Sequence, residues 1–244
     1  MNPLNYQRRT YRCRVSTHLR QEIVRIQETD IAVYADVSVA RCAKETIIKQ
    51  RGYLESYIDR HPGFLRSLQP WPADTLAPPI VQAMILAGKR AAVGPMAAVA
   101  GAMAEQVGRE ALKVAKEIVV ENGGDLFLHT TQDLTLAVFA GTSPLSMKVG
   151  LSIDAASMPM AVCTSSANVG HSLSLGRADA VCVLSSSCPL ADAAATAIGN
   201  RVQSTANIQS AIRWGQTITG VKGILIIVDD KIGAWGDINL LPIS

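Results

Sequence analysis

Residues 121–129, Glu-Asn-Gly-Gly-Asp-Leu-Phe-Leu-His, lie near the middle of the 244-residue chain, where a helical pattern is followed by strand patterns. A helical pattern covers residues 109–121, and the two glycines that follow are suited to a left-handed helix C-cap. Strand patterns cover residues 125–129 and 134–139. The short polar link between them, residues 130–133, favours a hairpin. The stretch therefore predicts a helix that leads directly into an antiparallel strand pair.

The second half of the chain repeats this order loosely. A helix is predicted to open at Pro189, because proline suits the first position of a helix, and another covers residues 206–218. Strand patterns lie at residues 160–163, 180–184, 223–228 and 232–235. Two strand pairs around two helices, occurring twice, predict an α+β fold in which an antiparallel sheet carries its helices on one side. A doubly wound α/β fold is the alternative, but the strand–helix alternation that it needs is missing.

The N-terminal part predicts two strands and two helices. Strand patterns lie at residues 11–15 and 31–35. A helical pattern over residues 39–59 has to end before Pro62, since the residue before a proline avoids the α region. A further helix is predicted to begin at Gly94-Pro95, and the alanines and glycines that follow allow it to lie close to a neighbouring backbone.

A proline-rich connector follows the first long helix. Residues 62–79 contain five prolines and predict an extended segment on the surface, with Phe64 and Trp71 as its anchors. The length of the chain suits one large domain. Residues 1–244 are therefore expected to form a single domain that includes the connector.

Composition favours a globular protein. The chain is 48% hydrophobic and 18% charged, which supports a sizeable core and argues against disorder. Six arginines lie among the first 25 residues, but Glu22, Glu28 and Asp30 end the cluster, so a solvated strand region is favoured over a nucleic-acid-binding arm. The most apolar segment, residues 91–103, is too short to span a bilayer. We therefore expect neither nucleic acid nor a membrane as a partner.

The five cysteines indicate a reducing compartment. They lie at positions 13, 42, 163, 182 and 188, no pair has the two-residue gap of a zinc or redox motif, and their number is odd. A disulfide framework is therefore not predicted. The arginine-rich N-terminus also lacks the apolar run of a secretory signal. We expect a cytoplasmic protein.

Two glycine-containing segments are candidates for ligand binding. Gly123 and Gly124 allow a ligand to approach the backbone, and Asn122 and Asp125 beside them can hydrogen-bond a ribose or a base. A helix C-cap before a strand explains the same glycines. Residues 140–146 carry three hydroxyls that can bind phosphate, although turn chemistry accounts for most of that segment.

The densest polar cluster is Cys-Thr-Ser-Ser-Ala-Asn-Val-Gly-His-Ser at residues 163–172. His171 lies in a glycine-bearing polar loop, which favours a general acid or base over a core histidine. Cys163 can act as a nucleophile if its pKa is lowered, but a free cysteine in a strand is more often a small core residue. The cluster also has three neighbouring hydroxyls that can bind a phosphate, on Thr164, Ser165 and Ser166.

The last candidate is the predicted helix around Pro189. Asp192 and Thr196 are four residues apart, so they project from one face of that helix. A carboxylate and a hydroxyl placed in this way are hard oxygen ligands, suited to a Mg²⁺ ion that bridges phosphate oxygens. Placement of an acid in the first helical turn, with the threonine bonded to its own backbone, is the alternative interpretation.

These segments resemble the ApbE-like superfamily, whose best-known members are FAD:protein FMN transferases. The resemblance rests on Glu-Asn-Gly-Gly-Asp at 121–125, Cys-Thr-Ser-Ser at 163–166, His171, and Ala-Asp-Ala-Ala-Ala-Thr at 191–196. It implies that Asp192 and Thr196 are magnesium ligands and that His171 and Asp192 are catalytic. It also implies a flavin nucleotide, FAD or FMN, contacted by Asn122, Gly123, Gly124, Asp125, Thr164, Ser165 and Ser166.

A closer resemblance covers nearly the whole chain and is to a branch of that superfamily whose activity is not established. It is carried by Glu-Thr-Asp at 28–30, Val-Gly-Pro-Met-Ala-Ala-Val-Ala-Gly at 93–101, Ala-Gly with Ser-Pro-Leu-Ser at 140–146, and Gly-His-Ser-Leu-Ser at 170–174. It implies a fold related to the tunnelling-fold (T-fold) proteins, whose sites are often buried between subunits, and hence a homo-oligomer. It also implies a role in sulfide assimilation into homocysteine in anaerobes.

Three departures from the transferase pattern leave the function open. The lysine of the transferase Gly-x-x-x-Lys-Gly stretch is missing near Gly101, Ser166 stands where a glycine is expected, and only 5% of the residues are aromatic, which leaves few rings to stack on a flavin. We therefore weigh three hypotheses. The first is a Mg²⁺-dependent enzyme of the flavin-nucleotide transferase type. The others are a flavin-free factor in sulfide assimilation that uses Cys163 or His171, and a ligand-binding module without catalysis.

Overall fold

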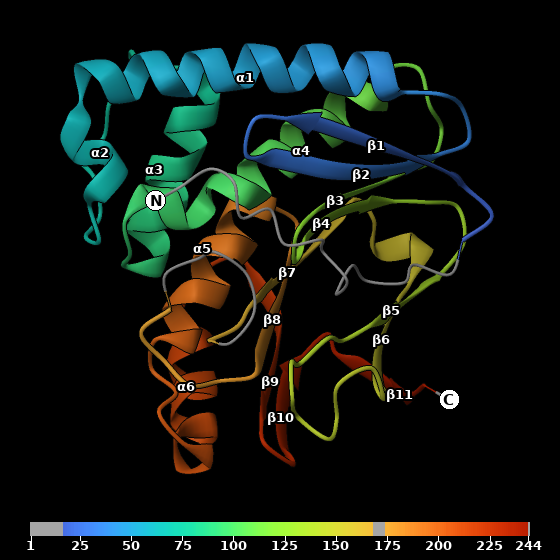
Figure 1. The fold of residues 1–244 in the computed structure, drawn as a ribbon. Helices are drawn as coiled ribbons and strands as arrows, with labels where there is room; N and C mark the ends of the chain where they lie inside the picture. Colours follow the sequence, from blue (N-terminus) through green and yellow to red (C-terminus); the bar gives the residue numbers. More distant parts are fainter. Residues whose placement is uncertain (1–16, 168–173, 244) are drawn as a thin grey trace.

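The computed structural model describes residues 17–167 and 174–243 (Figure 1). The predicted strand at residues 11–15 and the loop residue His171 lie outside this part. The strands are β1 (Arg20–Ile26), β2 (Thr29–Ala35), β3 (Ile118–Asn122), β4 (Asp125–His129), β5 (Leu134–Ala137), β6 (Val149–Ile153), β7 (Met160–Ser165), β8 (Ala180–Ser185), β9 (Val221–Val228), β10 (Lys231–Gly236) and β11 (Asn239–Pro242). The α-helices are α1 (Ala40–Arg60), α2 (Pro62–Arg66), α3 (Pro79–Ala91), α4 (Val99–Ala111), α5 (Cys188–Gly199) and α6 (Ile208–Gly215), and short 3₁₀ helices are η1 (Pro95–Ala98), η2 (Ala155–Ser157) and η3 (Thr205–Asn207).

Eight strands form one antiparallel sheet in the order β1-β2-β3-β4-β7-β8-β9-β10. The long helices pack on one face of this sheet, and a second sheet, β11-β6-β5, lies on the side away from them (Figure 1). The predicted α+β fold, an antiparallel sheet with its helices on one side, is confirmed. The second sheet was not predicted.

The large sheet consists of two halves with the same order of elements. In the first half β1 and β2 precede the helices and β3 and β4 follow them, and in the second half β7, β8, α5, α6, β9 and β10 repeat this order. The halves meet where β4 pairs with β7, with Asp125 opposite Cys163. The duplicated pattern is therefore present, but the first half closes with β3 and β4 and does not use residues 134–139.

Strand residues alternate between two hydrophobic cores. In β3, Ile118 and Val120 pack into the core on the helix side, whereas Val119 belongs to the core between the two sheets. Because both faces of the large sheet are covered, its central strands have to be apolar on both sides. This explains why β8 and most of β9 are continuous apolar runs and not an alternation of polar and apolar residues.

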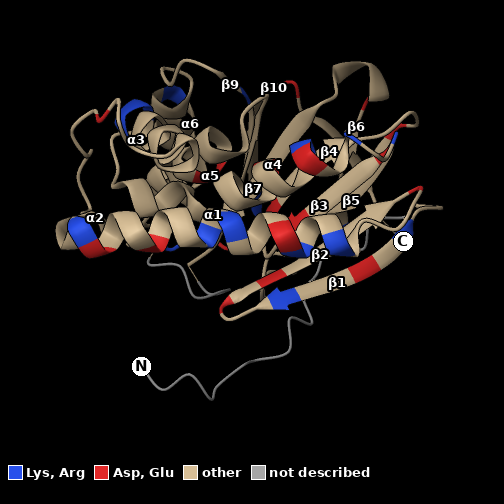
Figure 2. Cartoon of the chain, turned by 90° about the horizontal axis from the view of Figure 1, so that it is seen from above, with Lys and Arg blue, Asp and Glu red and all other residues tan. Residues whose placement is uncertain are grey.

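Charged side chains of both signs lie along α1, on the outside of the helix layer. Figure 2 shows lysine and arginine interspersed with aspartate and glutamate along this helix. Arg51 contacts Glu28 at 2.8 Å and Glu55 at 2.7 Å, so opposite charges compensate one another locally. The opposite side of α1 buries Ile47 and Leu54 against the core.

In the part of the chain that the structure describes, no single helix is both long and apolar enough to cross a membrane. Helix α3 and the segment Pro95–Ala111 reach the necessary length and composition only together, and they are bent by 106°. The apolar residues of both segments contribute to the core on the helix side of the sheet.

The predicted helix over residues 109–121 is wrong in its position. Helix α4 already ends at Ala111, and the β-branched run that begins at Ile118 forms strand β3. The paired glycines connect β3 to β4 as a two-residue hairpin turn, because Asn122 pairs with Asp125. Gly123 has a φ of 75°, which a hairpin turn of this length requires and which a helix C-cap would also have used. The glycines alone did not distinguish the two.

The predicted hairpin between residues 125–129 and 134–139 is also wrong. Strand β4 pairs with β3 and β7, whereas β5 pairs with β6 in the second sheet. The link between β4 and β5 is fixed by Glu117, whose Oε1 accepts hydrogen bonds from the backbone N–H of Thr131 at 2.7 Å and from its hydroxyl at 2.6 Å. A side chain at the start of β3 therefore directs the chain away from the large sheet.

Other predicted elements are confirmed with small changes. The long helix is α1 and ends at Arg60, before Pro62. The connector over residues 62–79 begins with a short helix, α2, and its anchor Phe64 is fully buried with Trp71 packed edge-on at 5.6 Å. Pro95 opens η1, which leads into α4. Helix α3 and strands β1, β6 and β11 were not predicted.

Helices α4 and α5 cap one another's N-termini. The carboxylate of Glu105 on α4 accepts a hydrogen bond from the backbone N–H of Cys188, the first residue of α5, at 2.8 Å. The carboxylate of Asp192 on α5 accepts one from the backbone N–H of Gly101, in the first turn of α4, at 2.8 Å. A side-chain acceptor for the free amides of a first turn stabilises a helix by about 1 kcal/mol. This exchange requires close contact, since a Cβ on Gly101 would lie 2.4 Å from the Cys188 carbonyl oxygen.

We predict that Gly101→Ala destabilises the protein by about 1–3 kcal/mol, because the added methyl group has to push the backbone of α5 away. Urea unfolding followed by circular dichroism measures this change. Gly52→Ala is the matched control, since Gly52 is exposed in α1 with no atom within 4 Å of an added Cβ. It should stabilise the protein by about 0.5–1 kcal/mol. Equal effects of the two substitutions would contradict the close contact between α4 and α5.

Candidate functional site

A cavity of about 910 Å³ lies at the end of the large sheet where the β3–β4 turn and the end of β7 meet helices α4 and α5. Its wall combines polar residues from these elements with apolar residues from β5 and β6. A volume of this size is sufficient for a nucleotide-sized ligand. The cavity is therefore the candidate ligand-binding site.

Nine of the predicted site residues line this single cavity, and they are Asn122, Gly123, Gly124, Asp125, Thr164, Ser165, Ser166, Asp192 and Thr196. They come from three segments that are far apart in the sequence. The tenth, His171, lies outside the described residues. The structure therefore brings the predicted residues together, while their roles in binding and catalysis stay predictions.

The two glycines of the β3–β4 turn have structural reasons of their own. Gly123 supplies the positive φ of the turn, and a Cβ on Gly124 would lie 2.6 Å from the carbonyl oxygen of Thr164. The backbone N–H of Thr164 donates to the Gly124 carbonyl at 2.9 Å. The turn therefore packs directly on the end of β7, and this contact holds the two loops of the cavity wall together.

Helix α5 presents a polar stripe to the cavity. Asp192, Thr196 and Asn200 are spaced by four residues, line the cavity, and are partly exposed, whereas the other residues from Cys188 to Gly199 are buried. The predicted shared face of Asp192 and Thr196 is confirmed. Asn200 was missed, although its spacing from Thr196 repeats that of the predicted pair.

The first turn of α4 positions Asp192 and Asn122. Both Gly101 and Ala100 donate backbone hydrogen bonds to the Asp192 carboxylate, which places a negative charge at the positive end of the α4 dipole. The side-chain amide of Asn122 donates to the Ala100 carbonyl at 3.1 Å. These contacts fix both side chains at the cavity wall without a ligand.

Two carboxylates lie close together at this point. Burial raises the pKa of Asp192 well above its ordinary value, and the neighbouring charge of Asp125 raises it further, although the amides of α4 oppose the shift. Asp125 is itself buried, with 8% of its surface exposed. Within the described residues no group of three His, Cys, Asp or Glu side chains is suited to a metal ion. A cation here would therefore take further oxygen ligands from Thr196, the backbone, water or a bound phosphate.

Cys163 is a core residue, as the sequence favoured. It is fully buried, its thiol donates to the Cys188 carbonyl at 3.5 Å, and it does not line the cavity. Burial raises the pKa of this thiol well above its usual value, which opposes formation of the nucleophilic thiolate. Cys182 does line the cavity, but burial raises its pKa to about 11, and its sulfur accepts a hydrogen bond from Thr164.

The two serine hydroxyls of residues 140–146 form hydrogen bonds with the backbone of this segment and of the β9–β10 turn. The Ser143 hydroxyl donates to the Asp229 carbonyl at 2.6 Å, and the Ser146 hydroxyl accepts a hydrogen bond from the Ala140 N–H at 3.0 Å. Neither serine lines the cavity. The preceding strand contributes apolar wall instead, since Leu136, Val138 and nearby Phe139 line it. The sequence did not predict this wall, because β5 reaches the cavity only as part of the second sheet.

A family model described as AbpE bacteria matches residues 14–232 of the chain. The chain belongs to the AbpE bacteria family. A UPF0280 protein of Methanocaldococcus jannaschii is 42% identical over 219 residues, which cover 87% of this chain and 89% of the relative. A UPF0280 protein of Methanocella arvoryzae is 41% identical over 212 residues, which cover 86% of each chain. The ApbE-like resemblance seen in the sequence is thereby confirmed.

Solved structures show the same fold in this AbpE bacteria family member and in flavin transferases. The flavin transferase ApbE of Vibrio cholerae superposes with a TM-score of 0.55 at 12% identity, covering 92% of this chain and 97% of that chain. The flavinyl transferase ApbE of Pseudomonas stutzeri, in its apo form, superposes with a TM-score of 0.57 at 12% identity. The superposition covers 89% of this chain and 94% of that chain. At this identity the similarity establishes the fold.

We predict that Asp192→Asn stabilises the metal-free protein at neutral pH. The raised folded-state pKa means that ionised Asp192 costs stability, and this cost grows as the pH rises from the ordinary carboxyl value of 3.8 toward the folded-state pKa. Asparagine keeps an oxygen acceptor for Gly101 and removes the charge. Thermal unfolding in a chelator should therefore give similar stabilities at about pH 4, and the variant should gain on the wild type toward about pH 7.

Asp230→Asn is the control of opposite sign for this experiment. Asp230 is fully exposed, and the hydrogen bond from Lys231 lowers its pKa. Its replacement by asparagine should therefore slightly lower the stability of the protein at neutral pH. A stability difference between wild type and Asp192→Asn that does not grow with pH would contradict the electrostatic description of the pair formed by Asp125 and Asp192.

Proposed function

We propose that this protein binds a flavin nucleotide, FAD or FMN, in the cavity together with Mg²⁺ and transfers a group from it. The observation that carries the proposal is the alignment of Asp192 and Thr196 on one face of α5, inside the cavity that also contains the β3–β4 turn and the end of β7. The shared fold of the ApbE flavin transferases supports the choice of a flavin over other nucleotides.

The oxygen atoms of this wall fit Mg²⁺. Magnesium is usually held by one or two carboxylates, with water and phosphate oxygens completing its octahedron. Asp192 and Thr196 would hold the ion, and Asp125 is the second carboxylate close to it. Two like charges this close favour a cation between them, because a cation removes the repulsion from Asp125 that adds to the effect of burial on the pKa of Asp192. When bound, the ion would neutralise charge on the phosphates of the ligand.

The remaining wall would bind and orient the ligand. Thr164, Ser165 and Ser166 line the cavity next to the turn of Asn122, Gly123, Gly124 and Asp125, and their hydroxyls would donate hydrogen bonds to a phosphate or bind a ribose. The apolar residues of β5 and β6, such as Leu136 and Leu151, would exclude water from a planar ring. Aliphatic packing would then replace the aromatic stacking that the composition lacks.

His171 completes the proposal as the general acid or base for the transfer. It follows Ser166 by five residues, so the same segment that contributes hydroxyls to the cavity wall leads to it. Its imidazole is the side chain of the 163–172 cluster whose ordinary pKa suits proton transfer near neutral pH. Together with Asp192 it forms the proposed catalytic set.

The alternative hypotheses receive less support. A flavin-free factor in sulfide assimilation would use Cys163 or His171, and the thiol of Cys163 is fully buried with a raised pKa, which leaves His171 to carry that hypothesis. A ligand-binding module without catalysis would explain the cavity, but it gives no reason for two carboxylates beside it. The single domain, the cytoplasmic location and the homo-oligomer stay predictions.

We predict that the purified protein binds FAD at least about 10-fold more tightly with Mg²⁺ than with a chelator, and that Asp192→Ala and Thr196→Val abolish this difference. Titration followed by flavin fluorescence measures the affinities. Thr205→Val is the matched control, because Thr205 lies in η3 and does not line the cavity.

Two results would contradict this proposal. If FAD binds equally with and without Mg²⁺, the ion has no part in binding. If Asp192→Ala retains the full effect of Mg²⁺ while Thr205→Val behaves like the wild type, the ion is held elsewhere. A flavin absorbance spectrum that survives desalting of the purified protein would support the flavin part of the proposal directly.

A further inference from the structure

Arg201 is a fixed cation at the rim of the cavity. Its guanidinium carbon lies 3.2 Å from the centre of the Trp214 ring, and its Nη1 donates a hydrogen bond to the Ala197 carbonyl at 2.8 Å. The side chain lines the cavity one residue after Asn200, the last member of the α5 stripe. The guanidinium group is held in one orientation by stacking on the Trp214 ring and by its hydrogen bond to the backbone. Little conformational entropy is therefore lost when it binds an anion.

This cation has no carboxylate partner in residues 17–167 and 174–243, where the ion pairs found lie elsewhere. One of its faces is covered by Trp214, and this burial lowers the pKa of the guanidinium below its usual value. Arginine stays protonated in proteins, so the group keeps its charge. A cation that is held in place and lacks a counter-charge among these residues is available to pair with an anionic ligand.

The charges of the cavity wall indicate how much negative charge the ligand carries. Among the residues that the structure describes, the charged ones that line it are Arg66, Asp125, Asp192 and Arg201, and their charges cancel when both acids are ionised, as a bound cation requires. With one Mg²⁺ bound the site carries a charge of +2, which a ligand with two negative charges neutralises. A diphosphate that links two nucleosides carries these two charges, and a phosphate monoester carries about the same charge near neutral pH. The choice between the two therefore rests on the spacing of the groups along α5.

Arg201 also lies at a suitable place for one phosphate of such a group. Its Nη1 is bound to the carbonyl of Ala197, the residue after Thr196, so the side chain folds back along α5 toward the proposed metal ligands. A helix rises by about 1.5 Å per residue, and Thr196 and Asn200 therefore lie about 6 Å apart along the axis. This spacing leaves one phosphate at the metal side and the next within reach of the guanidinium.

We propose that Arg201 binds the second phosphate of a diphosphate-linked nucleotide and thereby selects a dinucleotide such as FAD over a monophosphate such as FMN. This inference rests on the proposed function for the identity of the ligand, but the recognition of a diphosphate is a separate property. The planar fork of arginine matches two phosphate oxygens, which a lysine does not. Trp214 is then a positioning residue, since it acts through the orientation of Arg201.

The experiment compares the affinities of FAD, FMN, riboflavin and inorganic pyrophosphate, each with Mg²⁺, for the wild type, Arg201→Ala and Arg201→Lys. Calorimetric titration gives the dissociation constants. We expect Arg201→Ala to weaken the binding of FAD and of pyrophosphate by about 10- to 30-fold, as is usual for loss of a charged hydrogen-bonding partner. The binding of FMN should weaken by less than about 3-fold, and the binding of riboflavin should not change. Arg201→Lys should recover only part of the loss.

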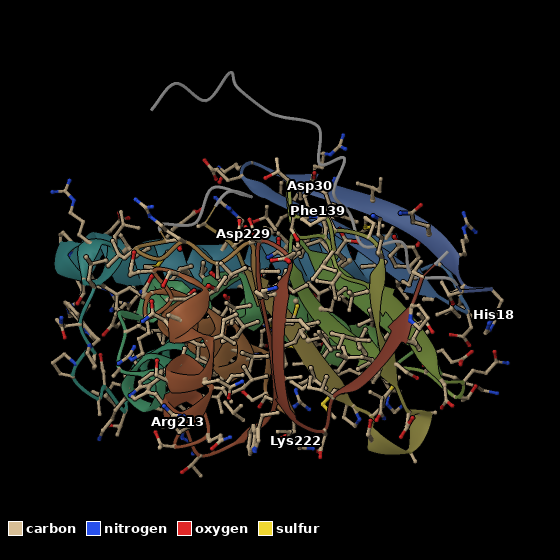
Figure 3. The ribbon with its side chains drawn as sticks, turned by 90° about the horizontal axis from the view of Figure 1, so that it is seen from below. His18, Asp30, Phe139, Arg213, Lys222 and Asp229 are labelled. Atoms are coloured by element: carbon tan, nitrogen blue, oxygen red, sulfur yellow. The ribbon has the colours of Figure 1, made fainter. Side chains whose placement is uncertain are left out.

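Arg213→Ala is the matched control, because Arg213 is exposed on α6 next to Trp214 and does not line the cavity. Figure 3 shows Arg213 at the outer edge of α6, well separated from the cavity residue Phe139. Thermal unfolding of each variant verifies that the fold is kept. Arg213→Ala should bind all four probes like the wild type.

Different outcomes separate this inference from the proposed function. An equal loss for FAD, FMN and riboflavin in Arg201→Ala, or no loss for FAD and pyrophosphate, would overturn diphosphate recognition and leave flavin binding intact. If the wild type binds no flavin but binds pyrophosphate through Arg201, the proposed function fails and the diphosphate site stands. A selective loss for FAD and pyrophosphate supports both.

Discussion

The direct contact between α4 and α5 is the constraint on which the site depends. Gly101 has no side chain, so the backbones of the two helices approach until a Cβ there would lie 2.4 Å from the Cys188 carbonyl oxygen. At this distance Glu105 and Asp192 each reach the first turn of the other helix. Since α4 belongs to the first half of the duplicated fold and α5 to the second, the exchange also joins the two halves. Asp192 is therefore positioned by the fold before any ligand arrives.

The same contact gives the site its electrostatic character. A carboxylate at a helix N-terminus is stabilised by free amides, but burial and Asp125 make its charge costly, and the net effect is a raised pKa. The fold therefore holds Asp125 and Asp192 close together, and a divalent cation would remove the repulsion between their charges. Just after the C-terminal end of α5, Arg201 is held by Trp214. The cavity wall therefore carries a negative group on α5, Asp192, and a positive group just after α5, Arg201.

The sequence was informative where the pattern is local. The spacing of Asp192 and Thr196 predicted their shared face, and Pro189 and the apolar runs near 180–184 and 223–228 predicted α5, β8 and β9. Pairing between distant strands was not predictable, because β5 carries no residue that distinguishes β4 from β6 as its partner. Arg201 was missed for the same reason, since its role depends on Trp214 and on a cavity that only the folded chain forms.

Crystals soaked with Mn²⁺ and FAD test the central claim most directly, since Mn²⁺ replaces Mg²⁺ at oxygen sites and gives an anomalous signal. We expect one strong anomalous peak within coordination distance of the Asp192 carboxylate and the Thr196 hydroxyl, with the diphosphate of FAD extending from it toward Arg201. FAD bound in the cavity without a peak between these two side chains, or a peak elsewhere on the protein, would show that Asp192 and Thr196 do not hold the ion.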